Sequence, residues 1–225
     1  MYGLIVLTRH ATNHAMLELR HPRIRQAKTA PHAPAPRTSL NRSNWIDLAL
    51  VTLVDGGIDL VRVDVLAKAL HVTRGSFYWH FKDRNDLLVQ MLDSWRTATT
   101  EQIIERFDVK RDEPRALLQE LLSLPFRGKS AHRAARVELA IREWARRDDM
   151  ARFAVDDVDS RRISYISQCF SALGFDVLEA RYRAFLLYAI DVAESLLANQ
   201  GTQIQKSERN HLAERLLLTR HPVGS

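Results

Sequence analysis

The sequence of 225 residues contains a single cysteine, Cys169, and no hydrophobic run long enough to cross a membrane. One cysteine excludes an internal disulfide framework and fits a reducing compartment. A membrane-spanning helix needs about 18 consecutive apolar residues. The early apolar stretch Leu4–Leu7 is also too short for the core of a signal peptide. These absences predict a cytoplasmic protein that does not enter a membrane.

The sequence also lacks the patterns that catalysis and cofactor binding require. It has no glycine-rich phosphate loop, no nucleophile elbow and no paired catalytic carboxylates. Four of the nine histidines, His10, His14, His21 and His32, precede residue 40, and the others show no metal-ligand spacing such as His-x3-His on one helix face. We therefore expect no enzyme activity, no bound metal and no cofactor.

Charge is unevenly distributed along the chain, whose formal net charge is +6. Residues 1–43 contain one acid, Glu18, and the bases Arg9, Arg20, Arg23, Arg25, Lys28, Arg37 and Arg42. The whole excess therefore lies in an N-terminal arm, and residues 44–225 are neutral overall. Such an arm can contact nucleic acid, or it can be a solvated tail without a partner.

The arm ends in a proline-rich stretch. Pro31, Pro34 and Pro36 occur within six residues and prevent a helix there. We therefore predict that residues 1–40 form a disordered basic arm. A start codon assigned too far upstream is the alternative explanation for this segment.

After the arm, apolar residues recur at helical spacing, without strand-like alternation or a two-residue hairpin turn. The first helix is expected to begin at an N-cap formed by Ser43 or Asn44 and to stop at Gly56. Further helices are predicted over 63–70, 73–80, 84–107, 114–124, 132–147, 150–173, 176–199 and 206–219. The fold class is therefore all-α.

The three short helices between residues 44 and 81 have the layout of a helix-turn-helix, with the motif at about 62–81. The third is short and presents small or polar side chains, as a helix that enters a DNA groove must. Thr73 is expected to cap it, Arg74 and Ser76 to reach base edges, and Gly75 to permit close approach. The predicted DNA-contacting residues are Arg62, Thr73, Arg74, Gly75, Ser76, Tyr78, His80, Lys82 and Arg84.

The most specific part of this motif is the run Phe77-Tyr-Trp-His-Phe-Lys-Asp-Arg-Asn-Asp-Leu-Leu88. It is similar to a pattern of the tetracycline-repressor (TetR) family of bacterial transcription regulators: Leu/Phe-Tyr-x-His-Phe, a small or polar pair, a basic residue and Leu-Leu. Leu66-Ala67 and Val72-Thr73 also resemble pairs in that family's second and third helices. The resemblance implies phosphate contacts for Thr73, Tyr78, His80 and Arg84, base contacts for Arg74 and Ser76, and core positions for Phe77 and Phe81.

Two positions depart from the family pattern. His71 stands in the turn where the family usually has glycine, and this position tends to need a positive φ, which strains histidine. Arg62 stands where the family usually has a threonine or serine cap. Asp64, in the first turn of that helix, is expected to compensate partly through the helix dipole.

Beyond residue 95 the resemblance is loose. It implies that the C-terminal helices form an effector pocket and that the last two helices pair with a second subunit. The apolar residues of 176–199 independently favour such a partner, because they form two stripes where one core-facing side needs about 100°. The predicted dimer interface comprises Phe185, Leu186, Ile190, Leu197, Leu212 and Leu216. A two-fold dimer implies a palindromic DNA operator.

The candidate pocket residues are Trp95, Thr99, Ile103, Trp144 and Phe170. Aromatic residues at helical spacing are more often plain core, so that alternative stays open for the three rings. Cys169 is expected to be a buried small hydrophobe. Asp156, Asp157 and Asp159 are expected on a solvated face or loop.

The sequence thus predicts three parts: the arm 1–40, a helix-turn-helix DNA-binding domain 41–90, and a helical effector-binding and dimerisation domain 91–225. The predicted function is a homodimeric transcriptional regulator, a repressor released from double-stranded DNA by a small apolar or amphipathic effector. The alternatives are a helical small-molecule-binding protein or enzyme whose helix-turn-helix is only a scaffold, and a protein-interaction adaptor.

Overall fold

The computed structural model describes residues 40–101, 104–105, 113–124 and 128–219, and all structural statements below concern these residues. Helices account for the regular structure in these ranges, and no strand occurs in them. This confirms the predicted all-α fold class. The predicted arm 1–40 lies, except for Leu40, outside the described residues.

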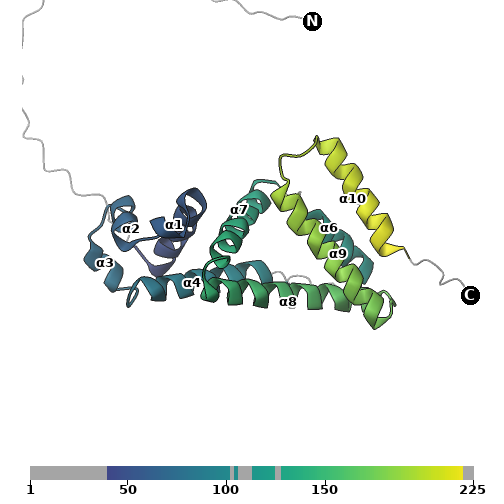
Figure 1. The fold of residues 1–225 in the computed structure, drawn as a ribbon, viewed down its shortest axis with the longest axis horizontal. Helices are drawn as coiled ribbons and strands as arrows, with labels where there is room; N and C mark the ends of the chain where they lie inside the picture. The colour runs from purple at the N-terminus through teal and green to yellow at the C-terminus, as the bar shows by residue number, and fades with distance from the viewer. Residues whose placement is uncertain (1–39, 102–103, 106–112, 125–127, 220–225) are drawn as a thin grey trace, which may run out of the picture. The chain divides into compact units, whose positions relative to one another are not determined.

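The N-terminal part consists of α1 (Arg42–Gly56), the short 3-10 turn η1 (Ile58–Leu60), α2 (Val63–Ala69) and α3 (Arg74–Tyr78), followed by α4 (Arg84–Arg96) (Figure 1). The N-cap of α1 is Asn41, so the prediction of Ser43 or Asn44 is wrong. The Asn41 side chain accepts from the Asn44 backbone N–H at 3.1 Å, and the Asn44 side chain accepts from the Asn41 backbone N–H at 2.9 Å. This reciprocal pair is an asparagine version of the capping box.

The turn between α2 and α3 has the strained residue that the sequence predicted. His71 has φ 57°, which places it in the left-handed region. The backbone N–H of the next residue, Val72, bonds the carbonyl oxygen of Ala67 at 3.0 Å and closes the turn behind α2. The helix-turn-helix therefore forms despite the missing glycine.

The helix predicted over 84–107 changes its geometry partway. α4 ends at Arg96 and continues as a π-helical turn, η2 (Thr97–Glu101). The hydroxyl of Thr99 donates to the carbonyl oxygen of Trp95 at 2.7 Å, four residues earlier. Such side-chain bonds to the helix backbone compete with its regular hydrogen-bond ladder, which is one cause of helix bending.

The C-terminal part consists of α6 (Pro114–Ser123), α7 (Gly128–Ala145), α8 (Asp149–Ala172), α9 (Val177–Leu196) and α10 (Gln203–Leu218). Side chains cap three of these helices at the N-cap position: Asp148 for α8, Asp176 for α9 and Thr202 for α10. α8 packs against α4, α6, α7 and α9. It therefore connects the N-terminal helices to the rest of the protein.

Two hydrophobic clusters form the core. The first contains α1 to α4, α7 and the start of α8, with Trp45, Phe77 and Met91 among its fully buried residues. The second contains α6, the end of α8, α9 and α10, and includes Phe170 and the buried Cys169. The predicted boundary between residues 90 and 91 falls inside α4, whose buried side chains belong to the first cluster on both sides of it. α4 is therefore shared by the two predicted domains.

Candidate functional site

Helix α3 is held against the core by one aromatic side chain. Phe77 is fully buried, meets the Trp45 ring edge-on at 5.4 Å between centroids, and stacks on Phe81 at 5.1 Å. These contacts fix one side of a five-residue helix that has too few backbone hydrogen bonds to be stable alone. The opposite side of α3 is therefore presented to solvent in a defined orientation.

The predicted DNA-contacting residues cluster around this helix, at the start of α2, along α3 and at the start of α4. The exposed ones are Arg62, Thr73, Arg74, Gly75, Tyr78, Lys82 and Arg84, and the half-buried ones are Ser76 and His80. Thr73 occupies the N-cap position of α3, but its side chain makes no capping hydrogen bond, so that part of the prediction is wrong.

Gly75 is not required by packing inside the chain. A Cβ atom placed there would meet the Thr73 hydroxyl at 3.6 Å, an ordinary contact distance. The small residue on the exposed side of α3 therefore leaves space for something outside the described chain, as the sequence analysis expected of a helix that enters a groove.

Trp79 is a candidate residue that the sequence analysis missed. Its side chain is 87% exposed, directly after Tyr78, which is 60% exposed. Burying both rings away from water would stabilise a complex, because large aromatic side chains contribute most of their binding free energy through burial. The sequence contained one indication of this exposure. In a helical turn that buries Phe77, the next two side chains point away from the core.

Arg84 has an internal role that the sequence analysis did not anticipate. Its Nε donates to the carbonyl oxygen of Val61 at 2.6 Å, and its Nη2 donates to the carbonyl oxygen of Ile58 at 2.9 Å. Arg62 pairs instead with the carboxylate of Asp64 at 2.7 Å, at the start of α2. That ion pair lowers the pKa of Asp64, mainly through the side-chain hydrogen bond from Arg62.

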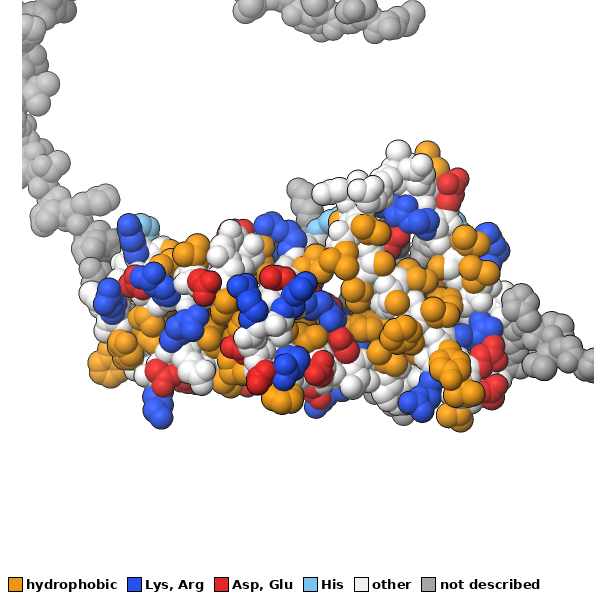
Figure 2. Space-filling model, viewed as in Figure 1, with side chains coloured by type: hydrophobic (Ala, Val, Ile, Leu, Met, Phe, Trp, Pro, Cys, Tyr) orange, Lys and Arg blue, Asp and Glu red, His pale blue; other side chains and the backbone are white. Residues whose placement is uncertain are grey.

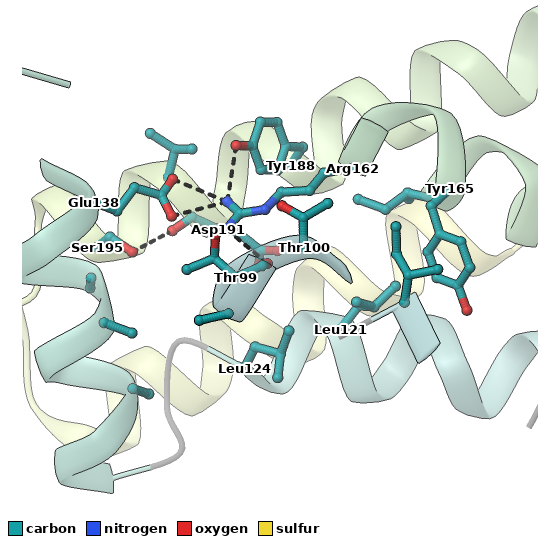
Figure 3. Close-up of a pocket in the computed structure, with 17 residues that line it drawn as sticks. Thr99, Thr100, Leu121, Leu124, Glu138, Arg162, Tyr165, Tyr188, Asp191 and Ser195 are labelled. Carbon is teal, nitrogen blue, oxygen red and sulfur yellow. Dashed lines mark hydrogen bonds and ion pairs between the residues drawn. The ribbon is translucent and has the colours of Figure 1, made fainter. Parts of the chain in front are cut away.

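A cavity of about 250 Å³ lies among η2, α6, α7, α8 and α9 (Figure 3). Its wall is largely apolar, formed by Ala98, Ile104, Leu121, Leu124, Ile166 and Val192 together with Ala131, Ala134 and Ala135. Of the predicted pocket residues, Thr99 lines this cavity. Ile103 lies outside the described residues.

The three rings predicted for the pocket do not line it. Trp95 and Trp144 are buried in the first core cluster, and Phe170 is buried in the second. The alternative that helically spaced aromatic residues are plain core therefore holds. The apolar part of the wall is mostly small and aliphatic, and the two rings that line the cavity are those of Tyr165 and Tyr188.

A network of half-buried charges borders the cavity. The Arg162 guanidinium donates to the Glu138 carboxylate at 3.0 Å and to the Thr99 carbonyl oxygen at 3.1 Å. Arg142 bonds both Glu138, at 2.9 Å, and Asp159, at 2.6 Å. Asp159 lies on α8 in this network, so the expectation of a solvated position is wrong for it.

Tyr188 joins the two arginines at the centre of the network. Its hydroxyl donates to Asp159 at 2.6 Å and accepts from Arg142 at 2.8 Å and from Arg162 at 3.2 Å. Burial raises the pKa of Tyr188, so the hydroxyl keeps the proton that it donates. The Tyr188 hydroxyl is therefore uncharged near neutral pH and acts as a donor to Asp159.

Asp191, on α9, lines the same cavity and is the least satisfied group in it. Its Oδ1 is buried and has no hydrogen-bond partner among the residues that the structure describes. Burial raises the pKa of this carboxyl well above its usual value, and Glu138 raises it further, while Arg162 lowers it. No sequence pattern indicates this role, because Asp191 lies between apolar stripes that predicted a subunit contact.

Apolar side chains gather on an exposed face of α9 and α10 (Figure 2). The exposed ones include Val177, Leu178, Tyr182, Phe185, Leu186, Leu196, Leu197, Ile204, Leu212 and Leu216. Ile190, which was predicted to join this face, is half-buried and packs on the second core cluster. An apolar face of this kind marks an interaction surface.

Among the described residues, every helix is too short or too polar to span a membrane. In the same residues, no group of three or more His, Cys, Asp or Glu side chains is arranged to hold a metal ion.

In sequence, the chain is similar to known proteins over its N-terminal helices. Residues 46–91 match the family model described as bacterial regulatory proteins, tetR family. The chain is 32% identical over 81 residues to the HTH-type transcriptional regulator AcrR of Shigella flexneri. That alignment covers 36% of this chain and 38% of the relative, so the similarity spans well under two thirds of AcrR.

Similarity to solved structures extends over most of the chain. A structure from Saccharomonospora viridis, of a transcriptional regulator in complex with choline, has a TM-score of 0.63 and 20% identity, covering 78% of this chain and 94% of that one. The transcriptional regulator FadR from Bacillus subtilis, in complex with stearoyl-CoA, has a TM-score of 0.57 and 19% identity, covering 79% and 97%. At such low identity these likenesses establish the fold.

Proposed function

We propose that the chain, whose residues 46–91 match the family model described as bacterial regulatory proteins, tetR family, is a DNA-binding transcriptional regulator whose affinity for DNA responds to a small molecule. The observation that carries this proposal is the exposed side of α3, which Phe77 anchors to the core and which presents Arg74, Gly75 and Tyr78 outward. A short, rigidly held helix with small and basic residues fits the major groove.

The proposed roles divide the exposed residues into two groups. Arg74 and Ser76, on α3, read base edges. The phosphate-contacting group comprises Arg62, Thr73, Tyr78, His80 and Lys82. Arg84 takes part mainly by holding the start of α4 against the loop before α2, since two of its donors are already bonded there. Trp79 joins the second group, because its exposed ring lies beside Tyr78.

The regulator acts as a homodimer in this proposal. The exposed apolar face of α9 and α10, centred on Leu186 and Leu216, would be covered by the same face of a second copy. Two copies related by a two-fold axis place two α3 helices on one face of a DNA duplex. The preferred site is therefore a palindrome.

The proposed response to a small molecule runs through α4. This helix begins beside α3 and ends in η2, whose Ala98, Thr99 and Thr100 line the cavity. A ligand that prefers one arrangement of η2 would bias the position of α4 and of the DNA-contacting helices with it. The proposal requires only that ligand affinity differ between two arrangements.

Structures similar to this chain hold ligands of different chemistry. The Saccharomonospora viridis protein was solved with choline and Bacillus subtilis FadR with stearoyl-CoA. These complexes support a ligand-responsive role for a protein of this fold. They do not identify the ligand of this chain, because ligand preference depends on the side chains that line its own cavity of about 250 Å³.

The main alternative is a helical small-molecule-binding protein or enzyme in which the helix-turn-helix is a scaffold. The cavity alone would suit a binding protein. That alternative does not explain the exposed side of α3, whereas a ligand-responsive regulator explains both the exposed helix and the cavity. We therefore propose a protein that is not an enzyme.

Selection of bound sequences from random duplex DNA tests the proposed function. The purified full-length protein should enrich a palindromic motif, and Tyr78→Ala should weaken binding to it. Lys68→Ala is the matched control, because Lys68 is an exposed residue of α2 outside the proposed contact set. Recovery of no motif, or equal binding by wild type and Tyr78→Ala, would favour the scaffold alternative.

A further inference from the structure

The buried carboxyl of Asp191 has no partner in the part of the chain that the structure describes, although charged groups surround it. Its Oδ1 is inaccessible to solvent and unbonded, and it lies in the wall of the cavity. Thr100, on η2, presents a second such atom, a buried hydroxyl without a hydrogen-bond partner. A buried polar atom without a hydrogen bond destabilises the protein. A ligand in the cavity that interacts with these two polar groups would offset that cost.

The charges around the cavity indicate the sign of that occupant. Glu138 and Asp159 are each bonded by arginine, and Arg142 and Arg162 are the two guanidinium groups that do so. These four charges balance one another. An ionised Asp191 is therefore a surplus negative charge at the edge of an apolar space, where it can be ionised only if a positive charge joins it.

The side chains that line the cavity indicate the size and polarity of the ligand. Apart from the polar groups near Asp191, the lining is alanine, leucine, isoleucine and valine together with Tyr165. A cavity of 150 Å³ holds a benzene molecule, so 250 Å³ corresponds to about ten non-hydrogen atoms. A hydrated inorganic ion would leave the apolar wall unused, whereas an organic cation would use both parts.

We propose that the cavity binds a small organic monocation, a protonated amine or quaternary ammonium compound with an apolar body, and that the Asp191 carboxylate is its counterion. This inference rests on the proposed function and names the effector class of the same cavity. Figure 3 shows Asp191 beside Arg162 and Thr100, on the side of the cavity where Glu138 and Ser195 also lie.

Binding of the cation should be coupled to proton release. Burial raises the pKa of the Asp191 carboxyl, and a bound cation would lower it because opposite charges attract. The titratable or charged groups that line the cavity with Asp191 are Glu138 from α7, Arg162 and Tyr165 from α8, and Tyr188 from α9. Of these, Glu138 and Arg162 shift the pKa of Asp191. The parts of η2 and α6 that line the cavity are uncharged. The affinity for a permanent cation should therefore rise as pH rises.

A pair of probes with one shape and different charge tests the proposal. Phenyltrimethylammonium is a permanent cation, and tert-butylbenzene has a carbon atom in place of its nitrogen. Calorimetric titration of the full-length protein is carried out with both, for wild type and Asp191→Asn. Asp156→Asn, which removes an exposed carboxylate from α8, is the matched control.

We expect wild type to bind the cation at least about tenfold more tightly than its neutral counterpart, in line with charge-assisted contacts. Asp191→Asn should lose that preference and its pH dependence while binding tert-butylbenzene within about twofold of wild type, which also shows that the variant is folded. Asp156→Asn should behave as wild type.

Equal affinity for the two probes, or undiminished cation binding by Asp191→Asn, would overturn the proposal. DNA binding is measured separately on the same samples. A protein that binds its DNA motif but prefers neither probe keeps the regulator function and loses the cation site. A protein that shows the Asp191-dependent preference but selects no DNA keeps the site and loses the regulator function.

Discussion

Arg84, the first residue of α4, donates a 2.6 Å hydrogen bond through Nε to the carbonyl oxygen of Val61, in the loop before α2. Residues 23 positions apart are thereby joined at the base of the helix-turn-helix. Val61 itself is fully buried, so the bond satisfies a carbonyl group at the edge of the core. The start of α4 and the start of α2 consequently move together.

Replacing Arg84 with alanine should therefore destabilise the protein. We expect a loss of about 1–2 kcal/mol in the free energy of unfolding, since the carbonyl oxygen of Val61 loses its charged donor. Denaturant unfolding measures this. Arg74→Ala removes an equal charge from an exposed position of α3 and serves as the control. Equal midpoints for the two variants would show that the bond contributes nothing to stability.

The neighbouring aromatic residues Phe77 and Trp79 should respond in opposite ways. Phe77→Ala empties a fully buried position and should cost roughly 3–5 kcal/mol of stability. Trp79→Ala should change stability by no more than about 0.5 kcal/mol because the side chain is 87% exposed. Trp79→Ala should nevertheless weaken DNA binding. Thermal unfolding and binding titrations on both variants decide this, and unaltered DNA affinity in Trp79→Ala would remove Trp79 from the interface.

Arg74 and Lys82 should separate base contacts from phosphate contacts. Arg74→Ala should abolish roughly 1–3 kcal/mol of discrimination at one position of the selected motif. Lys82→Ala should weaken all sequences alike and reduce the slope of log affinity against log salt by about 0.9 for each phosphate lost. Binding is measured on a panel of single-base variants at several salt concentrations. An unchanged base preference in Arg74→Ala would contradict its assignment.

A charge on the exposed apolar face should prevent dimerisation. Leu186 is 52% exposed, so Leu186→Glu can be accommodated by a monomer but not by a closed apolar interface. Loss of bivalent binding should weaken operator affinity roughly 100-fold or more. Sedimentation equilibrium gives the oligomeric state. Phe153→Glu, at a 67% exposed position of α8, is the control and should remain dimeric. A monomeric wild type would refute the proposed interface.

Asp191 should make stability depend on pH even without a ligand. Its carboxyl has a raised pKa in the folded protein, so the folded state keeps a proton that the unfolded state loses above about pH 3.9. Asp191→Asn has no such proton, so its stability relative to wild type should rise with pH from about 4 upward, by at most about 1.4 kcal/mol per pH unit. Asp156→Asn should show no such trend. A pH-independent difference between wild type and Asp191→Asn would mean that the carboxyl titrates normally.

The sequence by itself determined the helices and the exposed side of the helix-turn-helix. Helical periodicity depends on residues three and four apart, so Leu66 with Leu70 is informative without any tertiary contact. The core positions of Phe77 and Phe81 were implied by the family resemblance. The positive φ at His71 was also predicted from the family resemblance, because glycine is usual at that position of the turn. The apolar stripes of α9 likewise predicted exposed residues such as Phe185 and Leu186, because both stripes cannot face one core.

Only the tertiary structure decided which polar residues are buried and where a cavity remains. Asp159 on α8 and Tyr188 on α9 form a network with Glu138 and Arg142 on α7. This network and the buried position of the Asp191 carboxyl depend on helix packing, which local spacing does not contain. Arg84 was assigned to phosphates because its partners, two backbone carbonyls, have no sequence signature. Trp95 and Trp144 were candidates for a pocket that small side chains line instead, because a cavity is the space that packed helices fail to fill.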